Sequence, residues 1–277
     1  MRIGSRKSLI YSGISFDSSA IAYFNAAGIT NQTEKVAANT LIVGLKSGGL
    51  WDKLDSLHLF SPTSEVASLI CAKGLGSMTN VNSVSWDTNG FQPDYSSNYI
   101  NVGYDFSTDA VNASINDYSF GLAFTGMQQD VSGAVYFSGI YDTVNSVSCF
   151  FASQQTGPTY VYNGPTPSTT TNYGSSDGVN LSKHLYGTNK TTSRTIYVDG
   201  TPHTNSTTSV TAGTEPSINF FIGAIAVNGS PFYAYGSVPV IDPHFNFHFI
   251  SSWLTDSEIA MMFSLSNAYN TALGRGI

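Results

Sequence analysis

The chain contains 277 residues and carries a formal net charge of −7, from 11 Lys and Arg against 18 Asp and Glu. This acidic balance excludes the electrostatic attraction on which nucleic-acid-binding proteins depend. Only 10% of the residues are charged, whereas 41% are hydrophobic. Ser, Thr, Asn, Gly and Tyr must therefore cover the surface around a sizeable core.

Membrane and export signals are not expected either. A membrane-spanning helix needs about 18 consecutive apolar residues, and the sequence has no such run. The basic residues Arg2, Arg6 and Lys7 are not followed by the apolar stretch of a secretory signal peptide. We therefore expect a protein made and kept in a cytoplasm, or assembled there into a larger particle, without membrane insertion.

Residues 1–16 are interpreted as an N-terminal arm, and residues 17–54 as a helical anchoring segment. For the arm, two interpretations stay open: a frayed terminus, or an attachment arm that becomes ordered against a partner. In the helical segment, Asp17 is a suitable N-cap for a helix over residues 18–27, and Gly28 is suited to end it.

A second helix is predicted to follow. Either Thr30 or Thr33 is a suitable N-cap for it, and the pair Gly48-Gly49 is expected to stop it. After a turn, the alternation of polar and apolar residues predicts the first strand over residues 55–60.

Residues 55–277 have the pattern of one β domain. Short alternating runs separated by turn residues are typical of a sandwich. Strands are predicted in residues 55–60, 99–103, 120–125, 135–139, 146–151, 160–162, 194–198 and 218–223. Asp199-Gly200 is a strong hairpin signal, and the polar stretch 157–180 is expected to be a loop at a tip of the sandwich.

The C-terminal region combines a strand with a helix. Phe245, Phe247 and Phe249 alternate with polar residues, which predicts a strand with its aromatic face buried and with His244 and His248 on the exposed face. The next segment begins with Thr255 and Glu258, which fit a capping box. A helix with one apolar face is therefore expected after Thr255, with Gly274 at its end.

Three segments resemble a known family. Residues 194–200 (RTIYVDG) resemble the Arg-x-x-Tyr-Val-Asp-Gly hairpin of laminin-G/concanavalin-like jelly rolls. Residues 254–260 (LTDSEIA) resemble the ending of laminin-G-like domains in structural proteins of tailed bacteriophages, and residues 45–55 resemble a segment that precedes the jelly roll in those proteins. The resemblance implies a mainly β, two-sheet antiparallel jelly-roll sandwich with an N-terminal helical segment and a C-terminal helix.

The resemblance also implies a place on a virus particle. Capsid, neck or tail proteins would then be the partners, and the chain would form a homo-oligomer, with a trimer as the expected state. The location implied is the virion, assembled in the host cytoplasm.

Candidate binding residues are few. Tyr160, Tyr162 and Tyr173 flank the polar stretch and have the character of aromatic side chains that stack on sugars; the alternative is that Tyr160 and Tyr162 cover a sheet face. Jelly rolls of the resembled family often bind calcium through Asp side chains, and Asp142, Asp177 and Asp199 lie in predicted loops or turns. Their spacing does not select them, so solvated turn residues are the preferred interpretation, and no cofactor is expected.

The spacing of the remaining candidate residues gives little support for metal binding, glycoside hydrolysis or a disulfide. On a strand, His244 and His248 would lie about 13 Å apart, too far to share a metal ion. The paired carboxylates of concanavalin-like glycoside hydrolases have no matching motif. Cys71 and Cys149 are widely separated, and two buried free thiols are preferred over a disulfide.

These observations leave three hypotheses. The first is a non-enzymatic virion protein displayed on the particle surface as a head decoration, fibre or tail component and anchored by its N-terminal region. The second is a lectin-like adhesin that binds host-surface glycans. The third is a polysaccharide-degrading enzyme.

Overall fold

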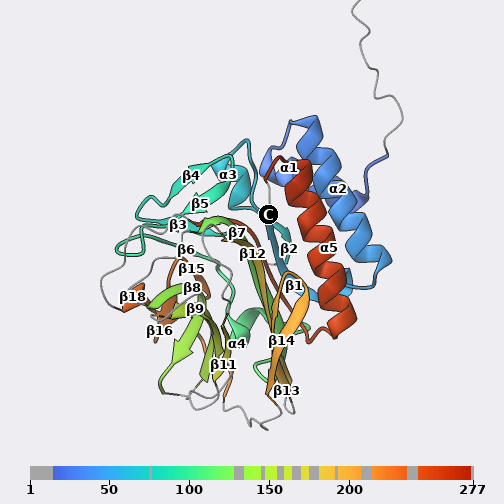
Figure 1. The fold of residues 1–277 in the computed structure, drawn as a ribbon. Coiled ribbons are helices and arrows are strands. Elements are labelled where there is room, and N and C mark those ends of the chain that lie inside the picture. The colour runs from blue at the N-terminus through green and yellow to red at the C-terminus, as the bar shows by residue number, and fades with distance from the viewer. Residues whose placement is uncertain are drawn as a thin grey trace, which may run out of the picture.

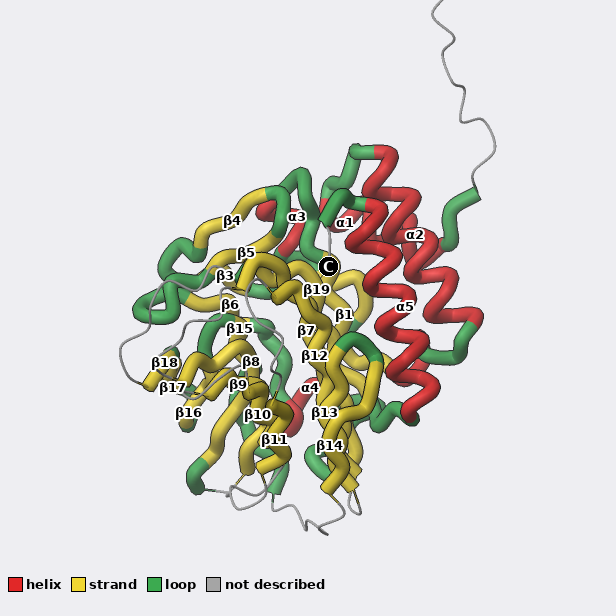
Figure 2. Tube along the Cα trace, viewed as in Figure 1, coloured by secondary structure: helices red, strands yellow, loops and turns green. Residues whose placement is uncertain are grey.

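A computed structural model describes the fold of residues 15–74, 77–127, 134–144, 147–154, 159–163, 170–174, 181–190, 193–206, 214–235 and 243–275. Two β-sheets face each other, and a layer of helices covers the outer face of one of them (Figures 1 and 2). The prediction of a mainly β, two-sheet sandwich with helices near both ends is confirmed. Within the described part of the chain, no helix is long and apolar enough to span a membrane.

The first sheet has nine described strands and forms the middle layer. In spatial order they are β14 (Thr201–Ser206), β13 (Ser193–Val198), β12 (Leu181–Lys190), β7 (Asp117–Met127), β19 (His244–Ser251), β1 (Leu54–Leu59) and β2 (Cys71–Lys73), with β5 (Gly90–Gln92) beside β19 and β4 (Ser85–Asp87) beside β5. The central strand β12 was not among the predicted strands.

The second sheet has ten described strands. In spatial order they are β11 (Thr170–Gly174), β10 (Thr159–Asn163), β9 (Val147–Gln154), β8 (Ala134–Asp142), β15 (Phe221–Ile222), β6 (Tyr99–Asn101) and β3 (Thr79–Val81), with β16 (Ile225–Val227) and β18 (Ala234–Tyr235) beside β8 and β17 (Ser230–Phe232) beside β16.

Aromatic residues fill the space between the sheets. The Phe120 ring from the nine-stranded sheet lies 4.4 Å from the Phe151 ring of the ten-stranded sheet, centroid to centroid. Phe124 and Phe137 form a second pair across the layers at 5.3 Å. Because these side chains are fully buried, they supply much of the hydrophobic stabilisation of the sandwich.

The helical layer consists of α1 (Ser18–Ala27), α2 (Gln32–Ser47) and α5 (Asp256–Ala272). Its apolar side chains form one cluster with Leu57, Phe247 and Phe249 of the nine-stranded sheet. The Tyr23 hydroxyl of α1 donates to the Leu59 carbonyl at 3.0 Å, which joins the first helix to β1. The short helices α3 (Glu65–Ser68) and α4 (Phe106–Asp109) and the 3-10 turn η1 (Trp51–Lys53) lie in connections.

The local end signals of the sequence are largely confirmed. Asp17 caps α1 by accepting from the Ser19 amide, and Gly28 ends the helix in a left-handed conformation. Thr255 and Glu258 form both hydrogen bonds of the capping box at the start of α5. At Asp199 and Gly200, φ is 50° and 74°, and this turn joins β13 to β14 as predicted.

Two predicted segments need correction. The N-cap of α2 is Asn31, whose side chain accepts from the Glu34 amide, so the choice between Thr30 and Thr33 is wrong. The predicted loop over residues 157–180 contains β10, which confirms the strand predicted at residues 160–162, and also β11, which was not predicted; the two pair with each other at the end of the ten-stranded sheet. Thr-rich sequences fit a strand as well as a loop, and composition alone favoured the loop.

Strand β19 also differs from its predicted role. Its register against β7 shifts between Phe245 and Phe247, so Phe245 packs between the sheets whereas Phe247 and Phe249 pack against the helices. Asn246 and His248 are fully buried. The prediction of an exposed polar face is wrong at these positions because the strand is covered on both sides.

Candidate functional site

The three tyrosines predicted to contact glycans lie at one end of the ten-stranded sheet. Tyr160 and Tyr162 belong to β10, and Tyr173 belongs to β11. The backbone register places Tyr160 directly opposite Tyr173. Their side chains lie outside the described part of the structure, so their proposed role stays a prediction.

The three candidate calcium residues are not brought together among the described residues. The Asp142 carboxylate accepts from the Val144 amide at 2.9 Å in the ten-stranded sheet. Asp199 lies in the other sheet, where its carboxylate accepts from Lys183 Nζ at 2.8 Å and from the His184 amide at 3.0 Å. Asp177 lies outside the described residues.

The histidines and cysteines singled out in the sequence are also separated. His244 Nε2 lies 3.3 Å from the Asp87 carboxylate, whereas His248 is fully buried. Cys71 and Cys149 are free thiols in different sheets.

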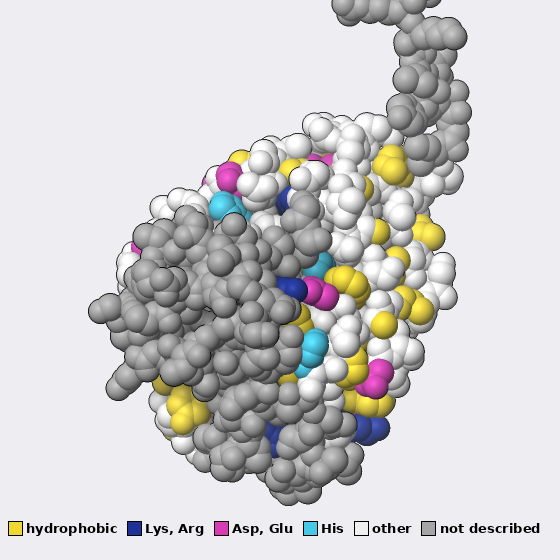
Figure 3. Space-filling model, in the orientation of Figure 1, with side chains coloured by type: hydrophobic (Ala, Val, Ile, Leu, Met, Phe, Trp, Pro, Cys, Tyr) yellow, Lys and Arg dark blue, Asp and Glu magenta, His cyan; other side chains and the backbone are white. Residues whose placement is uncertain are grey.

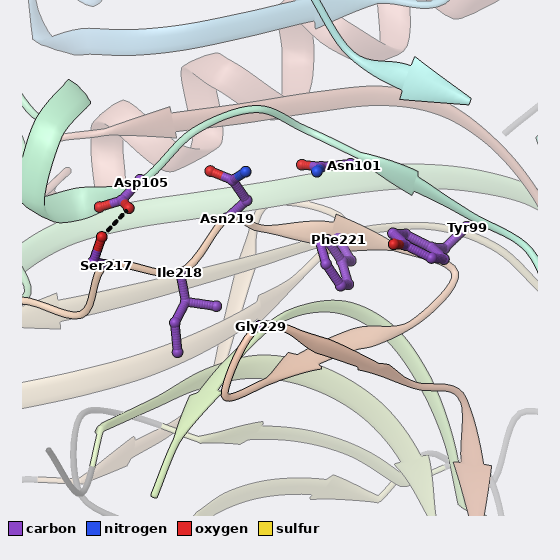
Figure 4. Close-up of a pocket in the computed structure, with 8 residues that line it drawn as sticks. All are labelled: Tyr99, Asn101, Asp105, Ser217, Ile218, Asn219, Phe221 and Gly229. Carbon is purple, nitrogen blue, oxygen red and sulfur yellow. Dashed lines mark hydrogen bonds between the residues drawn. The ribbon is translucent and has the colours of Figure 1, made fainter. Parts of the chain in front are cut away.

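A pocket opens on the outer face of the ten-stranded sheet (Figure 4). Its volume is about 250 Å³, just below the range of about 300–1,000 Å³ that is usual for small-molecule sites. The lining residues come from β6, from the N-cap of α4, from the segment before β15, from β15 itself and from the turn between β16 and β17: Tyr99, Asn101, Asp105, Ser217, Ile218, Asn219, Phe221 and Gly229.

Strand alternation explains why these side chains face outward. Phe221 pairs with Asn101, and Ile222 pairs with Ile100. Cross-strand partners share a sheet face, and the two isoleucines are fully buried in the sandwich core. By strand alternation Phe221 and Asn101 lie on the opposite, outer face, and Tyr99 joins them two residues before Asn101. Phe221 is itself buried, so Tyr99 supplies the accessible ring on this face.

One wall of the pocket is aromatic. The ring centroids of Tyr99 and Phe221 are 4.3 Å apart. Tyr233, which is not one of the lining residues, packs behind this wall with its ring 6.2 Å from that of Tyr99. Tyr99 is half-buried, which leaves part of its ring accessible.

The other wall is polar (Figure 4). The Asp105 carboxylate accepts from the Ser217 hydroxyl at 2.9 Å and from the Ser107 amide and hydroxyl, each at 2.7 Å. Asn101 Oδ1 accepts from the Gly103 amide at 2.9 Å. The Asn219 side chain forms no hydrogen bond with another described residue, so its amide donors and carbonyl acceptor remain available.

Sequence reasoning did not select this site. Residues 99–103 and 218–223 were predicted as strands, but a single strand pattern gives no reason to prefer Tyr99, Asn101 or Asn219 over other alternating residues. The pocket depends on the pairing of two strands more than a hundred residues apart, which only the fold reveals.

No family model and no curated protein matches the chain. Among solved structures, the chain is similar to a Trypanosoma rangeli sialidase in complex with sialic acid (TM-score 0.52, 13% identity, covering 79% of this chain and 34% of that one). It is also similar to the botulinum neurotoxin serotype G binding domain (TM-score 0.58, 12% identity, covering 77% and 51%). A further match is a T. rangeli sialidase mutant displaying trans-sialidase activity (TM-score 0.56, 13% identity, covering 91% and 38%). The chain thus spans about a third to a half of these proteins, and the likeness shows the β-sandwich fold.

Proposed function

We propose that the protein is a non-enzymatic, glycan-binding module whose binding site is the pocket on the outer face of the ten-stranded sheet. The observation that carries this proposal is the combination of the Tyr99 ring with the available amide of Asn219. A sugar presents an apolar ring face and a rim of hydroxyls, and such a ligand matches a pocket with one aromatic wall and one wall of hydrogen-bonding groups.

The charge of the pocket favours neutral sugars. Asp105 lines the pocket, and none of the described lining residues is basic. A carboxylated sugar would bring a second negative charge close to Asp105, whereas a hydroxyl or N-acetyl group can hydrogen-bond to the asparagines. We therefore propose hexoses or N-acetylhexosamines as ligands rather than sialylated or uronic sugars.

Binding without cleavage is favoured by the same residues. Glycoside hydrolysis ordinarily requires two carboxyl groups on either side of the scissile bond. Among the described residues that line the pocket, Asp105 is the single carboxylate, and both of its oxygens accept hydrogen bonds from serine groups. Incubation with the bound oligosaccharide should release no reducing ends; appearance of product with purified protein would contradict this assignment.

The test of glycan binding is a screen on an array of neutral, N-acetylated and sialylated glycans, followed by calorimetry with the best neutral ligand. Tyr99→Ala and Asn219→Ala should each weaken binding roughly fivefold, because each removes about 1 kcal/mol of contact. Tyr99→Phe should keep most of the affinity, since the ring remains.

The matched control is Asn89→Ala, which changes an exposed asparagine in the turn between β4 and β5. Its affinity should equal that of the unchanged protein. Binding that is restricted to sialylated glycans would refute the charge argument, and binding that survives both pocket substitutions would refute the site.

A second proposed role is that of a structural component on a tailed-phage particle, attached through the helical side. This proposal is supported by exposed apolar side chains on that layer: Ile21 of α1 is 45% exposed, Val43 of α2 is 41% exposed and Met261 of α5 is 38% exposed. Figure 3 shows hydrophobic side chains at several places over these helices. Burying them against a partner would be favourable.

Mass spectrometry of purified particles, calibrated against the major capsid protein, tests this role. A fixed stoichiometric copy number is expected, and deletion of residues 2–16 should give a folded protein that no longer joins particles. Absence of the protein from particles would eliminate the structural role. Incorporation of the truncated protein would show that the arm is not the anchor.

A further inference from the structure

A row of three titratable side chains crosses the nine-stranded sheet. His58 of β1 pairs with Cys71 of β2 on one side and with His248 of β19 on the other. The rings of His58 and His248 lie 6.2 Å apart. His248 lies 6.5 Å from the Phe220 ring of the opposite layer, so the two histidines face the interior of the sandwich and Cys71 lies beside them at the end of the sheet.

The imidazole beside Cys71 lacks hydrogen-bond partners other than the thiol. His58 is fully buried, and apart from the Cys71 sulfur neither of its ring nitrogens has a partner within the described structure. Buried polar groups are nearly always paired, so an imidazole with no partner but a thiol requires an explanation. It has the capacity to take the thiol proton and to remain beside the resulting thiolate as its counter-ion.

Cys71 is placed where a reagent can reach it. Strand β2 is the last strand at its end of the sheet among the described residues, and Cys71 is partly exposed. Its sulfur lies 3.9 Å from the Ser56 hydroxyl and 3.4 Å from the Leu57 carbonyl. Cys149 differs, because it is fully buried between the sheets.

The surrounding charges favour the thiolate. Burial alone would raise the pKa of Cys71, but the charge of His58 and hydrogen bonding lower it to about 7. The other titratable groups nearby are His248, Lys73 two residues along β2, and Tyr23 of α1, which packs on β2. Burial raises the pKa of Tyr23 and lowers that of His248. At neutral pH Tyr23 therefore adds no negative charge that would oppose the thiolate, and His248 adds no positive charge that would favour it.

We propose that Cys71 is a nucleophilic modification site, with His58 as its proton acceptor, that reacts with low-molecular-weight disulfides. The thiol proton passes to the His58 imidazole, and the Cys71 thiolate attacks one sulfur of the disulfide R–S–S–R. The S–S bond breaks, a Cys71–S–S–R mixed disulfide forms, and RS⁻ leaves and takes up a proton. The disulfide is the oxidant. Its leaving sulfur is reduced to the thiol RSH, and the Cys71 sulfur is oxidised in the mixed disulfide.

The experiment uses the folded full chain with dithiobis(nitrobenzoate), a small aromatic disulfide, and follows thiol release and intact mass. One thiol per chain should react, and peptide mapping should place the adduct on Cys71. The reaction rate should be half-maximal near pH 7, below the value of about 8.5 for an ordinary cysteine. Cys149→Ser should leave the rate unchanged, and Cys71→Ser should abolish it.

The variant His58→Gln tests whether the reactivity of Cys71 depends on the imidazole or only on the solvent exposure of the thiol. At pH 7 the variant should react about tenfold more slowly, and its pH midpoint should rise toward 8.5, because the counter-ion is lost. If this variant does not fold, the proposal is tested by the pH dependence of the reaction rate in the unchanged protein. A midpoint at or above 8.5, or reaction of both cysteines only after denaturation, would overturn the proposal. Because it involves neither the pocket nor the particle, its result is independent of the proposed function.

Discussion

Asp55→Ala is expected to lower the free energy of unfolding by about 3–5 kcal/mol, the largest effect of any single side chain considered. Asp55 is buried, and its carboxylate accepts from the amides of Val111, Asn112 and Ala113 at 2.8–3.1 Å and from the Tyr104 hydroxyl at 3.1 Å. Removing it leaves several buried donors without an acceptor, at roughly 1–3 kcal/mol each before relaxation.

Urea denaturation followed by circular dichroism measures this effect, with Asp52→Ala as the matched control. Asp52 is three residues earlier in the chain and is exposed, so its substitution should change stability by less than about 0.5 kcal/mol. The two proteins should differ in urea midpoint while keeping similar slopes. If Asp55→Ala lowers the free energy of unfolding by less than about 1 kcal/mol, water accepts the hydrogen bonds that the carboxylate accepted, and the prediction is wrong.

The second large effect is a loss of stability in acid caused by His184. This side chain is fully buried between β12 and α5, and its Nδ1 lies 2.8 Å from the Tyr186 hydroxyl and 3.0 Å from the Ser266 hydroxyl. Burial lowers its pKa from 6.5 to about 3. Between these values the unfolded chain binds a proton that the folded chain does not bind.

The sign of the effect follows from this difference. The stability contribution is complete above pH 6.5 and is lost as the pH falls toward 3, with a total on the order of 5 kcal/mol. His184→Gln should flatten the dependence of the urea midpoint on pH between 7 and 4. His203→Gln, at an exposed position on β14 where burial also lowers the histidine pKa, should flatten it less. Some slope will remain because burial also lowers the pKa of His248. Equal stability of the unchanged protein at pH 7 and pH 4 would refute this account.

The sequence predicted well the features that depend only on residues close together in the chain. The Asp17 cap, the capping box at Thr255 and the turn at Asp199 and Gly200 each depend on hydrogen bonds or backbone angles within a few residues. Such interactions leave a local pattern. The two-sheet class also followed from repeated alternation, together with the family resemblance.

Features that depend on the layer formed by α1, α2 and α5 could not be predicted from the sequence in this way. The alternation in β19 was interpreted as one buried and one exposed face, yet a register shift and the helices bury Asn246 and His248 as well. The pocket was missed for a related reason. Tyr99 and Asn219 acquire a shared site only through the pairing of β6 with β15, and no local signal marks that pairing.

The layered arrangement has a consequence for binding strength. The pocket is lined by residues of β6 and β15 in the ten-stranded sheet. Figure 1 shows this sheet on the side of the nine-stranded sheet away from α1, α2 and α5, and packed sheets lie about 10 Å apart. Any attachment through α1, α2 and α5 therefore leaves the pocket unobstructed and pointing away from the support. Copies mounted side by side would present their pockets in one direction, so that contacts too weak to hold one copy would combine into avid adhesion to a repetitive surface.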